Sequence, residues 1–178
     1  MLYWILSIVA VLVALLVIFI ALRPSEYTVT RTGKMKAPPA KVFEHVNDFR
    51  KWTAWSPWEQ IDPNLQRTHS GAAQGVGAKY HWVGGKNVGE GEMTITESRP
   101  SDLIRIKLEF IKPFASICDT LFTFTPEGDQ TVMTWKMEGK HNFVPKAMCL
   151  FMNMDKMIGD QFEKGLTTMK NVVEGKTA

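Results

Sequence analysis

The sequence has few of the residues that build a metal or catalytic centre. Its four histidines, His45, His69, His81 and His141, are scattered, and none has a second ligand three or four residues away to form a zinc site. No G-x-S-x-G nucleophile elbow is present. We therefore expect no metal and no cofactor, and no motif assigns a catalytic role to a named residue.

Cysteine is scarce as well, and basic residues form no block. Cys118 and Cys149 are the only cysteines, and they show neither a close pair nor a metal-ligand spacing. Two reduced thiols suit a domain on the cytosolic face, although the sequence also allows one disulfide between them. The formal net charge is +3 and the charges are scattered. This distribution excludes a nucleic-acid-binding footprint.

The most prominent feature that is present is an apolar run from Leu2 to Leu22, which contains no charged residue. At 1.5 Å per residue, roughly 20 helical residues span the hydrocarbon core of a bilayer, so the run predicts a transmembrane helix. No Lys or Arg precedes it and no small-x-small cleavage site follows, which argues against a signal peptide. Positive charge gathers after the run, from Arg23 onward. By the positive-inside rule, the globular part then faces the cytoplasm.

Behind this anchor, apolar residues alternate in short segments that predict strands. The predicted strands cover residues 27–36, 79–83, 90–98, 103–110, 116–125 and 131–139. Consecutive strands joined by tight turns predict a strongly curved antiparallel sheet. The glycine-rich region 71–91 lacks both the Walker spacing and the dinucleotide fingerprint. We interpret it as turns and bulges, with a hairpin turn at 84–87.

Two amphipathic segments predict helices on either side of the strands. Pro39 to Asn47 predicts a short helix with Val42, Phe43 and Val46 on its inner face. Residues 145–173 predict a long helix, because apolar residues recur at spacings of three or four. That stripe comprises Phe151, Met154, Ile158, Phe162, Leu166, Met169 and Val173. The segment is rich in flexible thioethers, which either fill the core or suit a surface that accepts varied apolar shapes; they belong to Met148, Met152, Met154, Met157 and Met169.

A tryptophan-rich stretch, Asp48 to Pro63, separates the short helix from the glycine-rich region. Trp52, Trp55 and Trp58 recur every three residues, which places them on one face of a helical turn until Pro57 interrupts it. Two interpretations stay open. The rings either plug one end of a hydrophobic core or line the mouth of a pocket.

The order of these elements resembles the START-like superfamily, also called SRPBCC or Bet v 1-like. APPAKVFEHVNDFRKWTAWSPW is similar to its opening motif, and GVGAKYHW, GEGEMTITESRP and FMNMDKMIGDQFEKGLTTMK are similar to its bacterial polyketide cyclase/dehydrase-like branch. The resemblance implies an α+β helix-grip fold, in which a curved antiparallel sheet wraps on a long C-terminal helix and encloses an apolar cavity. We expect one transmembrane helix before it, with residues 1–23 as the anchor and 24–178 as the domain.

The resemblance and the strand parity together predict which residues line the cavity. They are Trp52, Trp55, Trp58, Tyr80, Trp82, Met93, Ile106, Leu108, Phe122, Trp135, Met154, Ile158 and Phe162. Such a cavity implies a lipid, isoprenoid or polyketide-like ligand, bound or transported by a single-pass protein of the bacterial inner membrane. Two alternatives are a cyclase, aromatase or hydrolase-like enzyme acting in the same cavity, and a protein-interaction or stress-response module.

One carboxylate is a weak catalytic candidate. Glu97 shares parity with Met93 and Ile95, so a regular strand would point it toward the cavity. There it would act as a general base or anchor a polar ligand group. Alternatively, the strand bulges or ends at this point, and Glu97 reaches solvent or pairs with Arg99.

Overall fold

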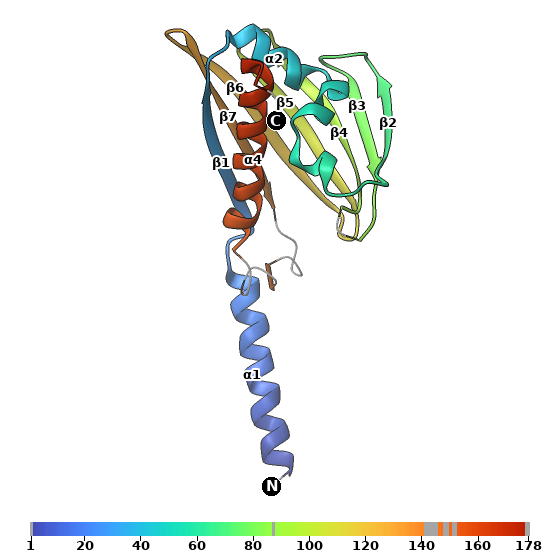
Figure 1. Cartoon of the computed structure of the whole chain (residues 1–178). Helices are drawn as coiled ribbons and strands as arrows, with labels where there is room; N and C mark the ends of the chain where they lie inside the picture. The colour runs from blue at the N-terminus through green and yellow to red at the C-terminus, as the bar shows by residue number, and fades with distance from the viewer. Residues whose placement is uncertain (1, 87, 141–145, 148–149, 151–152, 177–178) are drawn as a thin grey trace.

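The computed structural model describes residues 2–86, 88–140, 146–147, 150 and 153–176. Helix α1 (Leu2–Leu22) projects away from the rest of the chain (Figure 1). Its segment Tyr3–Leu22 has a mean hydropathy of 3.4 and is only 6% buried. The expected helix is therefore confirmed, and it is long and apolar enough to cross a membrane by length and composition.

The domain is built on one antiparallel sheet of seven strands, in the order β1-β7-β6-β5-β4-β3-β2. Its strands are β1 (Glu26–Met35), β2 (Gln66–Gly71), β3 (Ala78–Val83), β4 (Glu90–Arg99), β5 (Leu103–Lys112), β6 (Ser116–Glu127) and β7 (Gln130–Lys140). The six strands expected from hydrophobic alternation are all present. Alternation misses β2, because this edge strand, QRTHSG, has no apolar residue and leaves no pattern of period two.

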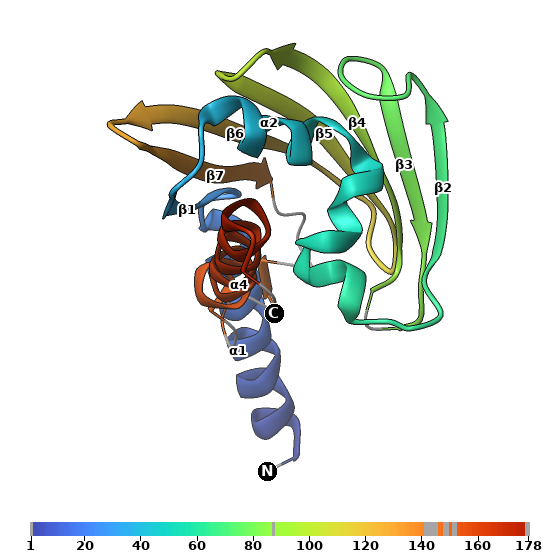
Figure 2. The same cartoon turned by 45° about the horizontal axis from the view of Figure 1, so that its top comes forward.

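The helices lie on the concave side of the curved sheet (Figure 2). They are α2 (Pro39–Asn47), two 3₁₀ helices, η1 (Phe49–Ala54) and η2 (Pro57–Gln60), and α4 (Met154–Glu174). Helix α2 has the predicted limits and buries the three predicted residues. Helix α4 begins later than residue 145, because the Asn153 side chain caps it by accepting a hydrogen bond from the Lys156 amide at 3.0 Å. His141, Met148, Cys149, Phe151, Met152 and the predicted helix start lie outside the described residues.

The strand register gives the concave face two ends. The tether end is the end of the strands next to α1. There Glu26, which follows α1 after three connecting residues, opens β1 opposite Lys140, and the β5–β6 turn lies at the same end of the strands. At the α2 end, Met35 lies opposite Thr131. The α2 end is filled by buried side chains, which include Met35, Val42, Phe43, Val46, Ile104, Phe124 and Met133. The solid core therefore occupies only part of the concave face.

Helix α4 runs along β1 and closes the concave face. Near the tether end, Arg31 of β1 donates hydrogen bonds to Glu163 at 2.8 Å and to the Asp155 carboxylate at 3.1 and 3.2 Å. A Cβ at Gly159 would overlap the Arg31 guanidinium, so glycine is what lets this side chain lie on the helix. At the α2 end, the Glu174 carboxylate accepts a hydrogen bond from the Lys36 amide at 2.8 Å.

Candidate functional site

A cavity of about 230 Å³ lies in the tether-end half of the concave face, between the sheet, η1, η2 and α4. Its wall is mainly aromatic and aliphatic. It is lined by Trp52, Ser56, Trp58, Glu59, Leu65, Tyr80, Trp82, Val88, Met93, Leu108, Phe110, Thr120, Trp135, Met137, Ile158 and Phe162. Because binding pockets commonly measure about 300–1,000 Å³, this volume suits a small apolar molecule or one part of a larger one.

The lining residues change from buried to partly exposed along the cavity. Trp135, Phe162 and Thr120 are almost completely buried. Val88, Phe110 and Ile158 are only partly buried, and they come from the β3–β4 connection, the end of β5 and the second turn of α4. The strand register places Val88 and Phe110 at the tether end. The open side of the cavity therefore faces the end of the domain that is joined to α1.

The tryptophan-rich stretch folds as two 3₁₀ turns. The Asp48 side chain caps the first turn by accepting a hydrogen bond from the Arg50 amide at 2.9 Å. The indole nitrogens of Trp52 and Trp55 donate to the carbonyls of Val46 at 3.0 Å and His45 at 3.1 Å, which ties the stretch to α2. Trp58 follows Pro57 in the second turn.

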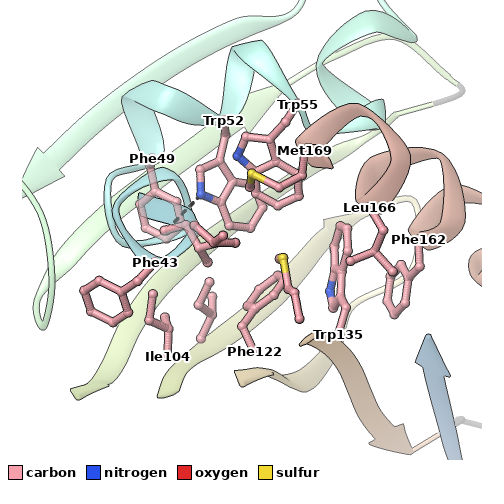
Figure 3. Packing of buried hydrophobic residues seen from close by; sticks show 14 of the residues in the cluster. Phe43, Phe49, Trp52, Trp55, Ile104, Phe122, Trp135, Phe162, Leu166 and Met169 are labelled. Atoms are coloured by element: carbon pink, nitrogen blue, oxygen red, sulfur yellow. Dashed lines mark hydrogen bonds between the residues drawn. The ribbon is translucent and has the colours of Figure 1, made fainter. Parts of the chain in front are cut away.

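These rings extend an aromatic cluster into the cavity wall. Trp135 stacks on Phe162, with ring centroids 4.1 Å apart and planes at 8°, so that β7 and α4 meet through two aromatic faces (Figure 3). Trp58 packs edge-on against both rings, at 5.5 Å and 6.0 Å. On the core side, Trp55 contacts Trp135 at 5.5 Å. The cluster forms a continuous surface from the solid core to the cavity mouth.

The structure brings nine of the thirteen predicted lining residues to the cavity. They are Trp52, Trp58, Tyr80, Trp82, Met93, Leu108, Trp135, Ile158 and Phe162. The other four predicted residues, Trp55, Ile106, Phe122 and Met154, do not line this cavity. Trp55, Ile106 and Phe122 point inward but are completely buried in the packed part of the core. Met154 lies in the first turn of α4, one turn before Ile158.

Seven lining residues were not among those predicted. Phe110, Thr120 and Met137 have the inward strand parity that would have identified them. Ser56, Glu59, Leu65 and Val88 lie outside regular strands, and no periodic signal could have placed them. The loops, therefore, contribute the part of the wall that the sequence pattern does not reveal.

Glu59 is the one charged residue among the described residues of the wall, and its side chain is only 5% exposed. One carboxylate oxygen accepts a hydrogen bond from the Tyr80 hydroxyl at 2.6 Å, and the other accepts one from the Arg67 guanidinium. Burial, together with the hydrogen bond to Glu59, raises the pKa of Tyr80 well above its ordinary value. The carboxylate is thus paired with a cation and a phenol that stays protonated.

Glu97 does not point toward the cavity, and of the two interpretations of this residue the structure supports the second, in which the strand bulges and Glu97 pairs with Arg99. The pairing of β4 with β5 shifts between Ile95 and Glu97, which is a β-bulge that turns the following side chains. Glu97 lies 3.3 Å from Arg99 and 3.4 Å from Arg105. A catalytic role for Glu97 required its side chain to point into the cavity, and it does not.

The described histidines do not gather at the cavity. His69 packs against the Tyr80 ring, with centroids 5.2 Å apart, and His81 lies 3.4 Å from Glu90. Across the described part of the chain, no three His, Cys, Asp or Glu side chains are grouped as metal ligands would be. The Cys118 thiol is buried and lies 3.0 Å from the Tyr27 hydroxyl; burial raises its pKa.

Comparisons with known proteins agree with this architecture. Residues 26–174 match the model of the family described as polyketide cyclase/dehydrase and lipid transport. No curated protein matches the chain in sequence.

Several solved structures share the fold at low identity. Protein CV1439 from Chromobacterium violaceum is 16% identical with a TM-score of 0.61, over 83% of this chain and 96% of that one. Aha1 from Colwellia psychrerythraea, solved as a dimer, is 12% identical with a TM-score of 0.61, over 85% and 99%. BexL, the di-domain ARO/CYC of the BE-7585A biosynthetic pathway, is 14% identical with a TM-score of 0.64, over 87% and 52%.

These likenesses show the Bet v 1-like helix-grip fold that the order of elements implies. The family match covers the domain from the start of β1 to the end of α4. The chain therefore belongs to the polyketide cyclase/dehydrase and lipid transport family of the START-like superfamily.

Proposed function

We propose that this protein is a membrane-tethered domain that binds or transports a lipid, an isoprenoid or a polyketide-like molecule. Residues 1–23 are the anchor, and residues 24–178 are the domain, on the cytoplasmic side of a bacterial inner membrane. The observation that carries the proposal is an apolar cavity whose open side faces the end of the sheet joined to α1. A bilayer-soluble ligand would meet the cavity mouth where it leaves the membrane.

The composition of the wall supports an apolar ligand. Thirteen of the sixteen described lining residues are aromatic or aliphatic, and Ser56, Glu59 and Thr120 are the others. The family description names both polyketide cyclase/dehydrase and lipid transport, and BexL is described as the di-domain ARO/CYC of a biosynthetic pathway. A mainly apolar wall with few polar groups is typical of a binding cavity for a lipophilic molecule.

An enzyme of the cyclase or aromatase kind is the second candidate, and the buried Glu59–Tyr80 pair is the observation that favours it. Both carboxylate oxygens of Glu59 already accept hydrogen bonds, from Tyr80 and from Arg67. Each oxygen keeps a second lone pair, but a general base must aim it at the substrate proton, and these two bonds hold the carboxylate toward Tyr80 and Arg67. The pairing therefore favours a structural role for Glu59, in which its carboxylate holds Tyr80 and Arg67 in place, over a catalytic one. A structural role agrees with the binding function.

The proposal is tested by identifying what the cavity holds. Full-length protein purified in detergent is examined by native mass spectrometry and solvent extraction, and binding of N-phenylnaphthylamine is measured by calorimetry. Met93→Trp fills the wall and should weaken probe binding at least tenfold, the effect of losing about 1.4 kcal/mol. Thr94→Trp, on the next residue of β4 with its side chain on the opposite face of the sheet, is the matched control.

Recovery of a lipophilic compound in stoichiometric amount, with binding weakened by Met93→Trp but not by Thr94→Trp, supports the proposal. If no compound is recovered and the probe does not bind, the binding function is contradicted. Conversion of a recovered compound by the wild type, lost in Glu59→Gln, would instead support the enzyme. A stoichiometric protein partner without a small molecule would support an interaction module.

A further inference from the structure

Exposed apolar side chains of the domain gather at its tether end. Outside α1, the described residues include seven large hydrophobic side chains that are exposed: Ile61, Val76, Val83, Ile111, Phe114, Ile117 and Met157. Only Val76, in the β2–β3 turn, lies at the α2 end. A clustering of this kind on one end of a soluble domain marks a surface that contacts another apolar phase.

The β5–β6 turn forms the most apolar part of this end. Ile111, Phe114 and Ile117 lie within seven residues, and Phe114 is 50% exposed at the turn itself. Lys112, whose side chain is 72% exposed, lies between Ile111 and Phe114 and pairs with Glu90 at 2.7 Å. Apolar and aromatic tips flanked by a lysine with a long aliphatic stem suit the interface of a bilayer.

The tether keeps this surface near the membrane. Only three residues, Arg23 to Ser25, separate the end of α1 from the start of β1. A fully extended chain spans at most about 3.6 Å per residue, so the four steps from Leu22 to Glu26 cover at most roughly 14 Å between the end of α1 and the start of the sheet. The strand register places the β5–β6 turn at the same end of the strands as Glu26.

We infer that the tether end of the sheet is a second membrane contact, in which the β5–β6 turn (residues 111–117) enters the interfacial layer of the bilayer. The occupant of this apolar surface is the lipid bilayer itself. Val88, Phe110 and Ile158 surround the open side of the cavity at the same end, so the ligand passes between bilayer and cavity without crossing bulk water.

This inference rests on the proposed membrane tether and goes beyond it, because a tethered domain need not touch the bilayer with its own surface. Two readouts distinguish the membrane tether from the contact between the sheet end and the bilayer. Resistance of the full-length protein to extraction by alkaline carbonate reports insertion of α1. Contact of the sheet end with lipid is reported by a probe attached to that end.

The experiment places the environment-sensitive fluorophore NBD on a single cysteine of the full-length protein. In a Cys118→Ser, Cys149→Ser background, Phe114→Cys and Val76→Cys are labelled and reconstituted in phosphatidylcholine–phosphatidylglycerol vesicles that contain a doxyl-labelled lipid. Val76 is the matched control, because it is also apolar and exposed but lies at the opposite end of the sheet. Quenching by the doxyl lipid and the emission maximum are measured for both positions.

We expect quenching at position 114 to be several-fold stronger than at position 76, with a blue-shifted emission. Equal quenching at both positions, with α1 resistant to carbonate extraction, would overturn the inference and leave the tether intact. Extraction of the protein by carbonate would contradict the tether itself. Because the NBD label can itself partition into the bilayer interface, the unlabelled variant Phe114→Asp, Ile117→Asp provides a second test. It should slow transfer of N-phenylnaphthylamine from vesicles to the cavity several-fold, whereas Val76→Asp should not. Equal transfer rates in these two variants would contradict the contact.

Discussion

Two of the three clustered tryptophans differ in what surrounds them, and this difference separates folding from ligand binding. Trp55 is completely buried, donates to the His45 carbonyl and does not line the cavity. Trp58 is partly exposed and lies at the cavity wall. Trp55→Ala should therefore lower the free energy of unfolding by about 3–5 kcal/mol. Trp58→Ala should cost less and should mainly weaken ligand binding.

Chemical denaturation of both variants, combined with calorimetric binding of N-phenylnaphthylamine, measures the two effects. The half-burial of Trp58 sets its expected destabilisation at about 1–2 kcal/mol, since full burial of a large apolar side chain contributes up to about 3 kcal/mol. Equal destabilisation by the two substitutions, with unchanged probe affinity in Trp58→Ala, would make both rings structural.

Thr120 tests a buried hydroxyl in the cavity wall. It is 5% exposed, and its Oγ1 has no hydrogen-bond partner among the described residues. An unpaired buried hydroxyl is unfavourable, so Thr120→Val should raise the free energy of unfolding by about 1 kcal/mol. The buried Thr131 hydroxyl donates to the Ala37 carbonyl at 2.6 Å, so Thr131→Val should lower it by about 1–2 kcal/mol.

Urea denaturation of the two valine variants gives opposite signs if the structure accounts for both hydroxyls. A loss of stability in Thr120→Val would mean that its hydroxyl has a partner in solution, such as a water molecule or a polar atom of the ligand.

At the scale of single residues, the sequence could predict which face of the sheet a side chain lies on. It could not predict whether an inward-facing side chain reaches the cavity or is buried in the packed core. Strand parity correctly turned Ile106, Leu108 and Phe122 inward. Of these three, only Leu108 reaches the cavity, because the hollow part is confined to the tether end. Depth depends on how far α2 and the 3₁₀ turns fill the sheet, which is a matter of three-dimensional packing. Glu97 shows a second limit, since one bulge reverses the parity of all that follows.

At the scale of elements, regular hydrophobic patterns were the reliable guide. Helix α2 has the limits that its proline and apolar stripe predict, and the alternating strands were found. The elements without such a pattern were missed, as with the polar edge strand β2. The late start of α4 depends on one side-chain cap at Asn153, which competes with an apolar stripe that continues toward the N-terminus.

Helix α4 also allows a test of how closely it approaches the sheet. A Cβ at Gly165 would lie 2.9 Å from the Trp135 ring and 3.1 Å from Pro57, and neither of these rigid groups can move aside easily. Alanine would gain about 1 kcal/mol of helix propensity. Overpacking costs about 1–3 kcal/mol, so the net effect of Gly165→Ala should be a loss of about 1 kcal/mol.

Thermal and urea denaturation of Gly165→Ala measure this balance. Lys164→Ala is the matched control on the exposed face of the same turn, where no close contact opposes the change. Because lysine and alanine have similar helix propensities, it should change the free energy of unfolding by only a few tenths of a kcal/mol. A gain in stability in Gly165→Ala would show that α4 lies farther from Trp135 than the structure places it.

The whole molecule divides its concave face between two tasks. The α2 end is packed solidly and holds the fold together, which leaves the tether end free to stay hollow. The hollow end lies next to the three-residue connection to α1 and carries most of the exposed apolar side chains. Stability and the proposed ligand exchange are therefore placed at opposite ends of one sheet.

This arrangement makes the length of the tether a variable that can be tested. Insertion of 20 Gly/Ser residues after Pro24 gives a flexible linker with an end-to-end distance of about 25 Å, well beyond the reach of the native connection. The effective concentration of the cavity mouth at the bilayer then falls. Uptake of N-phenylnaphthylamine from vesicles should slow several-fold, while the affinity for probe added from water should not change.

Stopped-flow fluorescence of full-length protein in vesicles measures the uptake rate. The matched control carries the same insertion after Gly128, in the β6–β7 turn at the α2 end, where a Cβ on Gly128 would meet no atom within 4 Å and an insertion is expected to be tolerated. Slower uptake only in the tether insertion would show that proximity to the bilayer limits exchange. Equal uptake rates in the two insertion variants would contradict this role of the tether, because the rate at which a cavity fills from bulk water does not depend on tether length.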